Sequence, residues 1–288
     1  MSPTSDLVAR YLSYRKRAGE LAPKSVANVR TYLYRWDTFI GGRSLSVIGR
    51  ADVERWLLDL ATLSPATRRH ALSALRQLYR WALIHGHVRA DPTTSVRGPR
   101  DPRRLPRAVR HDDVTAVLDA CPDVRARLIV TLAVQEGMRC IEIVRLEVGD
   151  IDRHAGTLRV VGKGGHERLL PLLADTQRAL DDYLAEYPAP GHGPLVRSFV
   201  QDRQALTSGA VSRLVSGWFT DAGVKHAPRD GMSAHALRHT CATDMLLAGA
   251  HLRDVQAALG HKHLQTTEVY LPTVVRGLES AMEGRSYR

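Results

Sequence analysis

Apolar residues recur at helical spacing through the first third of the chain. Between residues 23 and 40 they return at three- and four-residue steps, and two glycines end the pattern. The same spacing marks three more stretches, 5–19, 53–60 and 65–86. Ser64 and Pro65 suit the N-cap and the first helical position of the last stretch. Four helices with short connections predict a small all-α bundle over residues 1–90.

Residues 91–107 differ in composition from both flanks. Prolines and arginines are interleaved there: Pro92, Arg97, Pro99, Arg100, Pro102, Arg103, Arg104, Pro106 and Arg107. Proline fixes φ and removes a backbone donor, so the segment is predicted to be an extended linker. Its charge suits contact with a phosphate backbone, and a solvated tether fits the composition equally well.

Residues 108–288 combine helical patterns with one pair of strand-like runs. Helical spacing marks 111–121, 123–136, 139–146, 174–186, 208–222, 233–248, 252–259 and 274–282. Residues 157–161 and 168–172 read as strands around a Gly-Lys-Gly-Gly turn. The predicted fold is mainly α. An all-helical N-terminal domain is followed by a mixed, mostly helical domain with a small β-sheet or hairpin.

The composition is that of a globular protein outside the membrane. Hydrophobic residues make up 44% of the 288 residues and charged residues 25%. No apolar stretch approaches the roughly 20 residues that span a bilayer, and the first ten residues lack the pattern of a secretory signal. Three cysteines without paired spacing argue against a disulfide framework. We therefore expect a cytoplasmic protein.

Positive charge is concentrated at the N-terminal end. The net charge is +11, and residues 1–100 hold 17 basic and 7 acidic residues, against 24 and 23 in the remainder. Clustered Lys and Arg favour a polyanionic partner, nucleic acid before membrane, because binding releases counterions. A basic protein without such a partner is the alternative. The preference for Arg over Lys also fits a GC-rich genome.

One predicted helix gathers His235, Arg238 and His239 on a single face, at i, i+3 and i+4. The two histidines have the spacing of a zincin helix. That site needs a Glu after the first His, where this chain has Ala236, and a third ligand is not evident. An Arg between the histidines repels a cation and attracts an anion, so this face suits phosphate.

Three further positions carry weaker signals. Arg139 and Glu142 lie at i, i+3, where the carboxylate can orient the guanidinium, although such pairs are common on helix surfaces. Lys163 lies in the glycine-rich turn, which is ordinary hairpin chemistry. His261 follows a helix that Gly260 ends, and Tyr270 comes nine residues later. A phenol is a poor nucleophile unless cations surround it.

Taken together and in order, these motifs resemble the tyrosine recombinase (phage integrase) family. The order is Gly-Met-Arg-x-x-Glu, Gly-Lys-Gly after a strand, His-x-Leu-Arg-His-Thr-x-Ala-Thr, Leu-Gly-His, and Thr-Thr-x-x-Tyr. The resemblance covers residues 111–288, and the N-terminal helices look like the family's core-binding domain. Cys140-Ile141 and Leu271 depart from the usual pattern at positions without a chemical role.

The resemblance implies a mechanism. Tyr270 attacks a scissile DNA phosphate and forms a 3′-phosphotyrosyl link. Arg139 and Arg238 bind the non-bridging oxygens, where negative charge grows in the transition state. Lys163 is the general acid for the leaving 5′-hydroxyl. The link conserves the phosphodiester energy, so no metal, nucleotide or other cofactor is implied.

The remaining site residues have supporting roles by the same resemblance. His235 is the base or proton partner of the tyrosine, His261 hydrogen-bonds the phosphate, and Glu142 orients the site. His239 is expected to be structural, because the family uses the first histidine of the motif and its arginine.

The implied partners are double-stranded DNA recombination sites and further copies of the chain. A homotetramer is expected on DNA, with the C-terminal segment 274–282 docking on a neighbouring protomer or, alternatively, in cis. The two domains are expected to grip opposite faces of the duplex. DNA-binding candidates lie on the second and fourth helices: Lys24, Arg30, Arg68, Arg69 and Arg76. Directionality or DNA-bending factors are possible accessory partners.

Two biological roles fit this resemblance. One is integration and excision of a phage or mobile element, and the other is Xer-type resolution of chromosome dimers. The first helix begins close to Met1, which leaves no room for an arm-binding domain and fits both roles. A DNA-binding protein without catalysis is less favoured, because all the expected catalytic groups are present. Either role places the protein on DNA in a bacterial cell or a phage-infected host.

Overall fold

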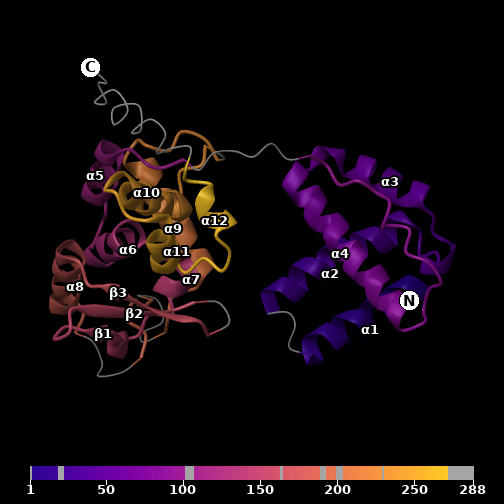
Figure 1. Cartoon of the computed structure of the whole chain (residues 1–288), viewed down its shortest axis with the longest axis horizontal. Helices are drawn as coiled ribbons and strands as arrows, with labels where there is room; N and C mark the ends of the chain where they lie inside the picture. The colour runs from indigo at the N-terminus through magenta and orange to yellow at the C-terminus, as the bar shows by residue number, and fades with distance from the viewer. Residues whose placement is uncertain are drawn as a thin grey trace, which may run out of the picture. The chain divides into compact units, whose positions relative to one another are not determined.

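The computed structural model describes residues 2–18, 23–100, 107–162, 165–188, 193–198, 204–228 and 230–271, without the side chains of residues 23 and 24. The chain forms two compact units, Met1–Arg103 and Arg104–Arg288 (Figure 1). Three predicted features fall outside the described residues: Lys163 at the hairpin tip, the linker segment 101–106 and the C-terminal segment 274–282.

The described part of the first unit is all-helical, as predicted. Its helices are α1 (Pro3–Arg17), α2 (Pro23–Phe39), α3 (Arg50–Asp59) and α4 (Pro65–Ile84), with 3-10 turns at Leu45–Val47 and Leu60–Thr62. Helix α4 begins where its N-cap predicts, since the Ser64 hydroxyl accepts a hydrogen bond from the Thr67 amide. Trp36 and Trp56 pack edge to face in the core, with ring centroids 5.0 Å apart.

The first part of the predicted linker packs on this unit. Thr93 and Val96 are buried, and the Arg76 guanidinium of α4 donates a hydrogen bond to the Val96 carbonyl. Composition favoured an extended segment from residue 91, but two buried side chains and this bond hold residues 93–96 against the helical core.

The second unit is mixed, as predicted. Its helices are α5 (His111–Asp119), α6 (Val124–Val134), α7 (Cys140–Ile143), α8 (Ala174–Glu186), α9 (Ser208–Asp221), α10 (Ala234–Leu247), α11 (Leu252–Leu259) and α12 (Gln265–Glu268), with a 3-10 turn at Val148–Asp150. Helix α6 is apolar nearly all round and packs against both α8 and α10, so it forms the centre of the core. None of the helices within the described ranges is long and apolar enough to cross a bilayer.

A small antiparallel sheet lies beside these helices (Figure 1). Strands β1 (Ile151–Asp152), β2 (Thr157–Val161) and β3 (Glu167–Pro171) pair in the order β1-β2-β3. The β2–β3 hairpin confirms the strand prediction, with Val160 opposite Arg168. Strand β1 was not predicted, because two residues are too few to produce an alternating pattern.

Two sharp turns bring distant segments together at the site. Gly137, between α6 and α7, has φ +59°, and Gly260, which ends α11, has φ +61°. A Cβ at Gly137 would lie 2.7 Å from a Leu259 methyl carbon, so the first turn lies directly against the end of α11. This contact depends on glycine at position 137.

Candidate active site

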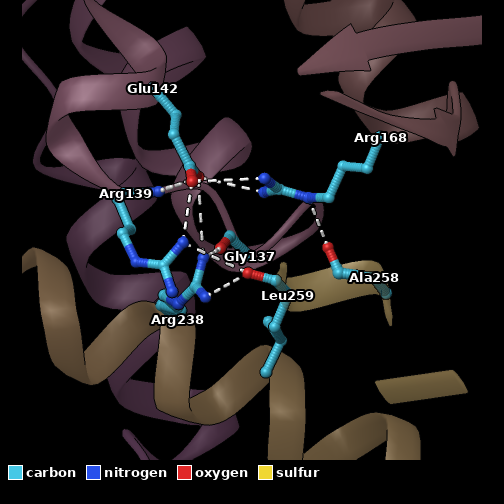
Figure 2. Close-up of polar contacts among 7 residues, drawn as sticks. All are labelled: Gly137, Arg139, Glu142, Arg168, Arg238, Ala258 and Leu259. Carbon is cyan, nitrogen blue, oxygen red and sulfur yellow. Dashed lines mark hydrogen bonds and ion pairs between the residues drawn. The ribbon is translucent and has the colours of Figure 1, made fainter. Parts of the chain in front are cut away.

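Glu142 is the centre of a buried ionic cluster. Its side chain is 1% exposed and lies in the first turn of α7. It accepts hydrogen bonds from the Arg139 backbone amide at 2.9 Å and from Arg139 Nη1 at 2.7 Å. Arg168 on β3 donates from Nη1 at 3.2 Å and from Nη2 at 2.9 Å (Figure 2). One carboxylate therefore orients two arginines from separate elements.

Arg238 enters the same cluster from α10. Its side chain is 1% exposed and donates to the carbonyls of Gly137 and Leu259. Arg139 Nη1 also donates to the Leu259 carbonyl, at 3.2 Å (Figure 2). Carbonyls at the C-terminal end of a helix lack intrahelical partners and carry partial negative charge. The end of α11 therefore holds two guanidinium groups side by side.

The cluster carries excess positive charge. Three guanidinium groups surround one carboxylate, which leaves a net charge of about +2. Burial raises the pKa of Glu142, but the hydrogen bonds from Arg168 and the Arg139 amide outweigh burial and lower it overall. Burial and the neighbouring Arg139 charge lower the pKa of Arg238 to about 10, so this group stays charged at neutral pH. Such an excess suits an anionic ligand.

An open pocket of about 330 Å³ lies beside the cluster. Arg139, His235 and Arg238 line it, together with hydroxyl and other groups from three segments: Cys140, Ile141, Ser208, Ser212, Ser233 and Ala234. The Nε of Arg238 is buried and has no hydrogen-bond partner among the described residues. Guanidinium, imidazole and hydroxyl donors around one cavity can bind a phosphate group.

Tyr270 is buried next to two histidines. The phenol is 2% exposed, and its oxygen lies 2.7 Å from Nδ1 of His239. The ring of His261 lies parallel to the tyrosine ring, with centroids 6.4 Å apart, and its Nδ1 is 2.8 Å from the Thr267 hydroxyl. Tyr270 does not line the pocket beside the cluster. In the free chain the phenol is therefore held apart from that pocket.

The histidines of the site are neutral at pH 7. Desolvation, followed by the charges of Arg238 and Arg139, lowers the pKa of His235. Desolvation also lowers the pKa of His239 and of His261 to about 4. Burial raises the pKa of Tyr270, although Arg238 and Arg139 partly oppose this shift. A neutral His239 can therefore accept the hydrogen bond of a protonated phenol.

The structure brings most predicted site residues together. Arg139, His235 and Arg238 line the pocket, and Glu142 binds Arg139 beside it. His261 follows α11 and Tyr270 follows α12, and their rings lie parallel with centroids 6.4 Å apart.

Two residues outside the predicted set also take part. His239 contacts the tyrosine oxygen, and its place on the same helix face as Arg238 was a usable signal. Arg168 contacts Glu142, and no sequence pattern distinguished it from other strand arginines.

The predicted DNA-binding residues of the first unit differ in their exposure and contacts. Arg30 and Arg69 are exposed. Arg68 donates a hydrogen bond to the Leu57 carbonyl and Arg76 to the Val96 carbonyl, so both also hold their own unit together. The side chain of Lys24 lies outside the described residues.

Within the described ranges, no group of three His, Cys, Asp or Glu residues is placed to hold a metal ion. The i, i+4 pair of His235 and His239 instead forms an edge-to-face ring contact, with centroids 4.3 Å apart. Arg238 follows His235 by one helical turn, and its charge lowers the pKa of both histidines. The arrangement suits an anion rather than a cation.

Known proteins share both the sequence and the fold. The Phage integrase family model matches residues 107–274, and the model for the phage integrase N-terminal SAM-like domain matches residues 8–86. Tyrosine recombinase XerC of Shewanella amazonensis is 31% identical over 99% of this chain and 97% of its own length. Tyrosine recombinase XerD of Mycobacterium leprae is 32% identical over 95% of this chain and 94% of its own.

Solved structures show the same fold at lower identity. A lambda integrase dimer bound to a COC′ core site superposes with a TM-score of 0.78 at 21% identity, covering 92% of this chain and 97% of that one. The XerH site-specific recombinase bound to a palindromic difH substrate gives a TM-score of 0.76 at 23% identity, covering 96% and 84%. The chain therefore belongs to the phage integrase family of tyrosine recombinases.

Proposed function

We propose that the chain binds duplex DNA at specific sites and cuts and rejoins the strands through Tyr270. The phenol oxygen attacks the scissile phosphorus, the bond to the 5′-oxygen breaks, and a 3′-phosphotyrosyl link remains. Attack by the freed 5′-hydroxyl of another strand reverses these steps. The observation that carries the proposal is the pair Arg139 and Arg238, which share the Leu259 carbonyl and line a pocket large enough for a phosphate group.

The two arginines stabilise the transition state. Each offers guanidinium donors to the non-bridging oxygens, where charge increases as the phosphorus becomes five-coordinate. Because the Glu142 cluster holds them in place, little reorganisation is needed when the phosphate enters. Lys163 supplies the proton to the leaving 5′-oxygen, and the step needs no metal, nucleotide or other cofactor.

The three histidines of the site have different roles. His239 accepts the hydrogen bond of the tyrosine in the free chain, which the 2.7 Å contact supports. His235 lines the pocket, where it contacts the bound phosphate and accepts the proton that the phenol releases. His261 packs against the tyrosine ring and reaches the phosphate once DNA is bound. Tyr270 leaves its buried position for attack, because it does not line the pocket in the free chain.

Assembly on DNA follows the related structures. Their titles describe a lambda integrase dimer on a core site and a lambda integrase tetramer on a Holliday junction. We infer that this chain forms a homotetramer on paired sites in the bacterial cytoplasm, assisted by directionality or DNA-bending factors. Its C-terminal segment docks on the neighbouring protomer.

Two biological roles remain open to experiment. The first is integration and excision of a phage or mobile element. The second is Xer-type resolution of chromosome dimers, which is favoured by the similarity to XerC and XerD proteins over nearly their whole length. Mapping the cleaved site in the host chromosome separates the two, since an attachment site beside phage genes and a site among housekeeping genes lie in different contexts.

Covalent capture of DNA tests the proposal. The wild-type chain first selects its site from a randomised duplex library, and a nicked duplex of that site then traps the adduct on denaturing gels. Tyr270→Phe is expected to bind this duplex normally and to form no adduct. Tyr183→Phe is the matched control, because that tyrosine is also buried in the second unit but bonds to the Leu195 carbonyl. An adduct formed by the Tyr270→Phe protein would overturn the assignment.

A further inference from the structure

Arg168 connects three parts of the second unit. From β3 its two terminal nitrogens reach both oxygens of Glu142 at the start of α7. Its Nε donates to the carbonyl of Ala258, near the end of α11, at 2.7 Å (Figure 2). The side chain is only 11% exposed. A Cβ at position 260 would lie 3.0 Å from Arg168 Nη1, so Gly260 leaves the space that this arginine occupies.

We propose that Arg168 is a positioning residue for DNA cleavage, which frees Arg139 and Arg238 for the scissile phosphate by neutralising Glu142 and holding the end of α11. The inference rests on the proposed function and adds to it a residue that acts through others. Arg168 itself does not line the pocket that Arg139 and Arg238 line, so its effect on the phosphate is indirect.

Charge balance supports this role. With Arg168 the cluster has three cations and one anion, so about two positive charges remain for a phosphate that becomes a dianion in the transition state. Without Arg168 only about one remains, and the buried carboxylate of Glu142 draws Arg139 and Arg238 toward itself. Arg238 Nη1 is already within 3.6 Å of Glu142 Oε2. Buried charges of opposite sign attract strongly when no other partner is present.

Geometry supports the same role. The carbonyl of Leu259, which follows Ala258, accepts hydrogen bonds from both phosphate-binding arginines. Because Arg168 holds Ala258, it fixes the backbone that presents this shared acceptor. Arg168 also follows Lys163 by five residues in the sequence, on the second strand of the β2–β3 hairpin. A single guanidinium thus links the hairpin strand, the carboxylate and the acceptor in one rigid arrangement.

The test compares four variants in single-turnover cleavage of the nicked duplex selected by the wild-type chain. Arg168→Gln is expected to bind this duplex with nearly unchanged affinity and to cleave it about 100-fold more slowly, as for a misplacement of about 1 Å in the reacting groups. Arg168→Lys keeps the positive charge but loses the planar guanidinium that binds both oxygens of Glu142, so we expect a rate between those of the wild type and Arg168→Gln. Arg159→Gln is the control, because Arg159 on β2 also pairs with two carboxylates, Glu167 of β3 and Asp150 of the preceding 3-10 turn, and neither belongs to the Glu142 cluster. It should cleave at the wild-type rate.

The double variant Glu142→Gln/Arg168→Gln distinguishes positioning from simple loss of structure. It removes the anion together with its partner, which restores the net charge of about +2. We expect it to cleave about tenfold faster than Arg168→Gln, a coupling typical of groups in direct contact. Removing both members of a buried pair costs less stability than removing one. If Arg168→Gln fails to fold, the double variant is therefore compared with the wild type, relative to which it should cleave about tenfold more slowly, and wild-type rates in both this variant and Arg168→Lys would overturn the proposal.

A neutral substrate gives a second readout. With a methylphosphonate at the scissile position, less negative charge develops, so the loss caused by Arg168→Gln should shrink well below 100-fold. An equal loss on both substrates, or a double variant no faster than Arg168→Gln, would overturn the proposal, as would wild-type cleavage by Arg168→Gln. Wild-type protein that forms no adduct would instead overturn the proposed function.

Discussion

Gly137→Ala tests whether the contact between two turns positions the arginines. Gly137 has φ +59°, and its carbonyl accepts a hydrogen bond from Arg238. A Cβ there would lie 2.7 Å from Leu259 Cδ2 and 3.0 Å from Cys241 Sγ. Leu259 is fully buried, so its side chain has no open space into which to move. The substitution therefore pushes directly on the residue whose carbonyl both arginines share.

The stability effect has two parts. A non-glycine residue with positive φ costs about 1–2 kcal/mol of folding free energy, and overpacking a core costs about 1–3 kcal/mol more. Gly156→Ala isolates the first part, because Gly156 has φ +63° with no atom within 4 Å of the added Cβ. Replacing glycine by alanine also lowers the conformational entropy of the unfolded chain, which raises stability by a similar amount in both variants. Gly137→Ala should therefore be about 1–3 kcal/mol less stable than Gly156→Ala.

The assay must report on the second unit by itself, within the full chain. Hydrogen exchange of the protected amides in α6 and α10 does so, since these helices form the core of that unit. Covalent cleavage of the selected duplex is measured alongside. We expect a loss of about 100-fold for Gly137→Ala, because both carbonyl acceptors move, and wild-type cleavage for Gly156→Ala.

Equal stability of the two glycine variants would refute the packing argument. Normal cleavage by a destabilised Gly137→Ala protein would refute the idea that this contact positions Arg139 and Arg238.

Three other predictions follow from the described side chains. His239 and His261 have pKa values of about 4, against 6.5 when unfolded, so between these values the unfolded chain binds more protons than the folded chain. The free energy of unfolding of the second unit should therefore fall as the pH is lowered through this range, by up to about 3 kcal/mol per histidine. Hydrogen-exchange protection that does not change with pH would contradict this. Cleavage should persist in excess EDTA without nucleotide, and loss of activity that Mg²⁺ or Zn²⁺ restores would show the metal-free mechanism to be wrong. Arg30→Ala should lower the DNA affinity and reduce its salt dependence by about one counterion, while leaving folding intact. Arg76→Ala should have the same effects and should also destabilise the first unit, because its hydrogen bond to the Val96 carbonyl is lost. An unchanged salt dependence in both variants would exclude direct phosphate contacts.

The sequence predicted what neighbouring residues determine. Helical spacing and N-cap residues located most helices of both units, because these signals act within one or two turns of the chain. The four-residue helix α12 was not predicted, and the helix predicted at 139–146 is confined to Cys140–Ile143. The Arg139–Glu142 pair was predicted for the same reason, since three residues separate its members. The ordered motifs, compared with a known family, then indicated the chemistry.

Only the tertiary structure decided which distant groups meet. Glu142 and Arg168 are 26 residues apart, and Arg139 and the Leu259 carbonyl are 120 residues apart. His239 reaches Tyr270 across 31 residues, so its role depends on how α12 packs rather than on its own helix. Periodicity shows that a face is buried but does not show which face it packs against. The partners of a buried charge are therefore set by packing, which brings the three arginines around one carboxylate.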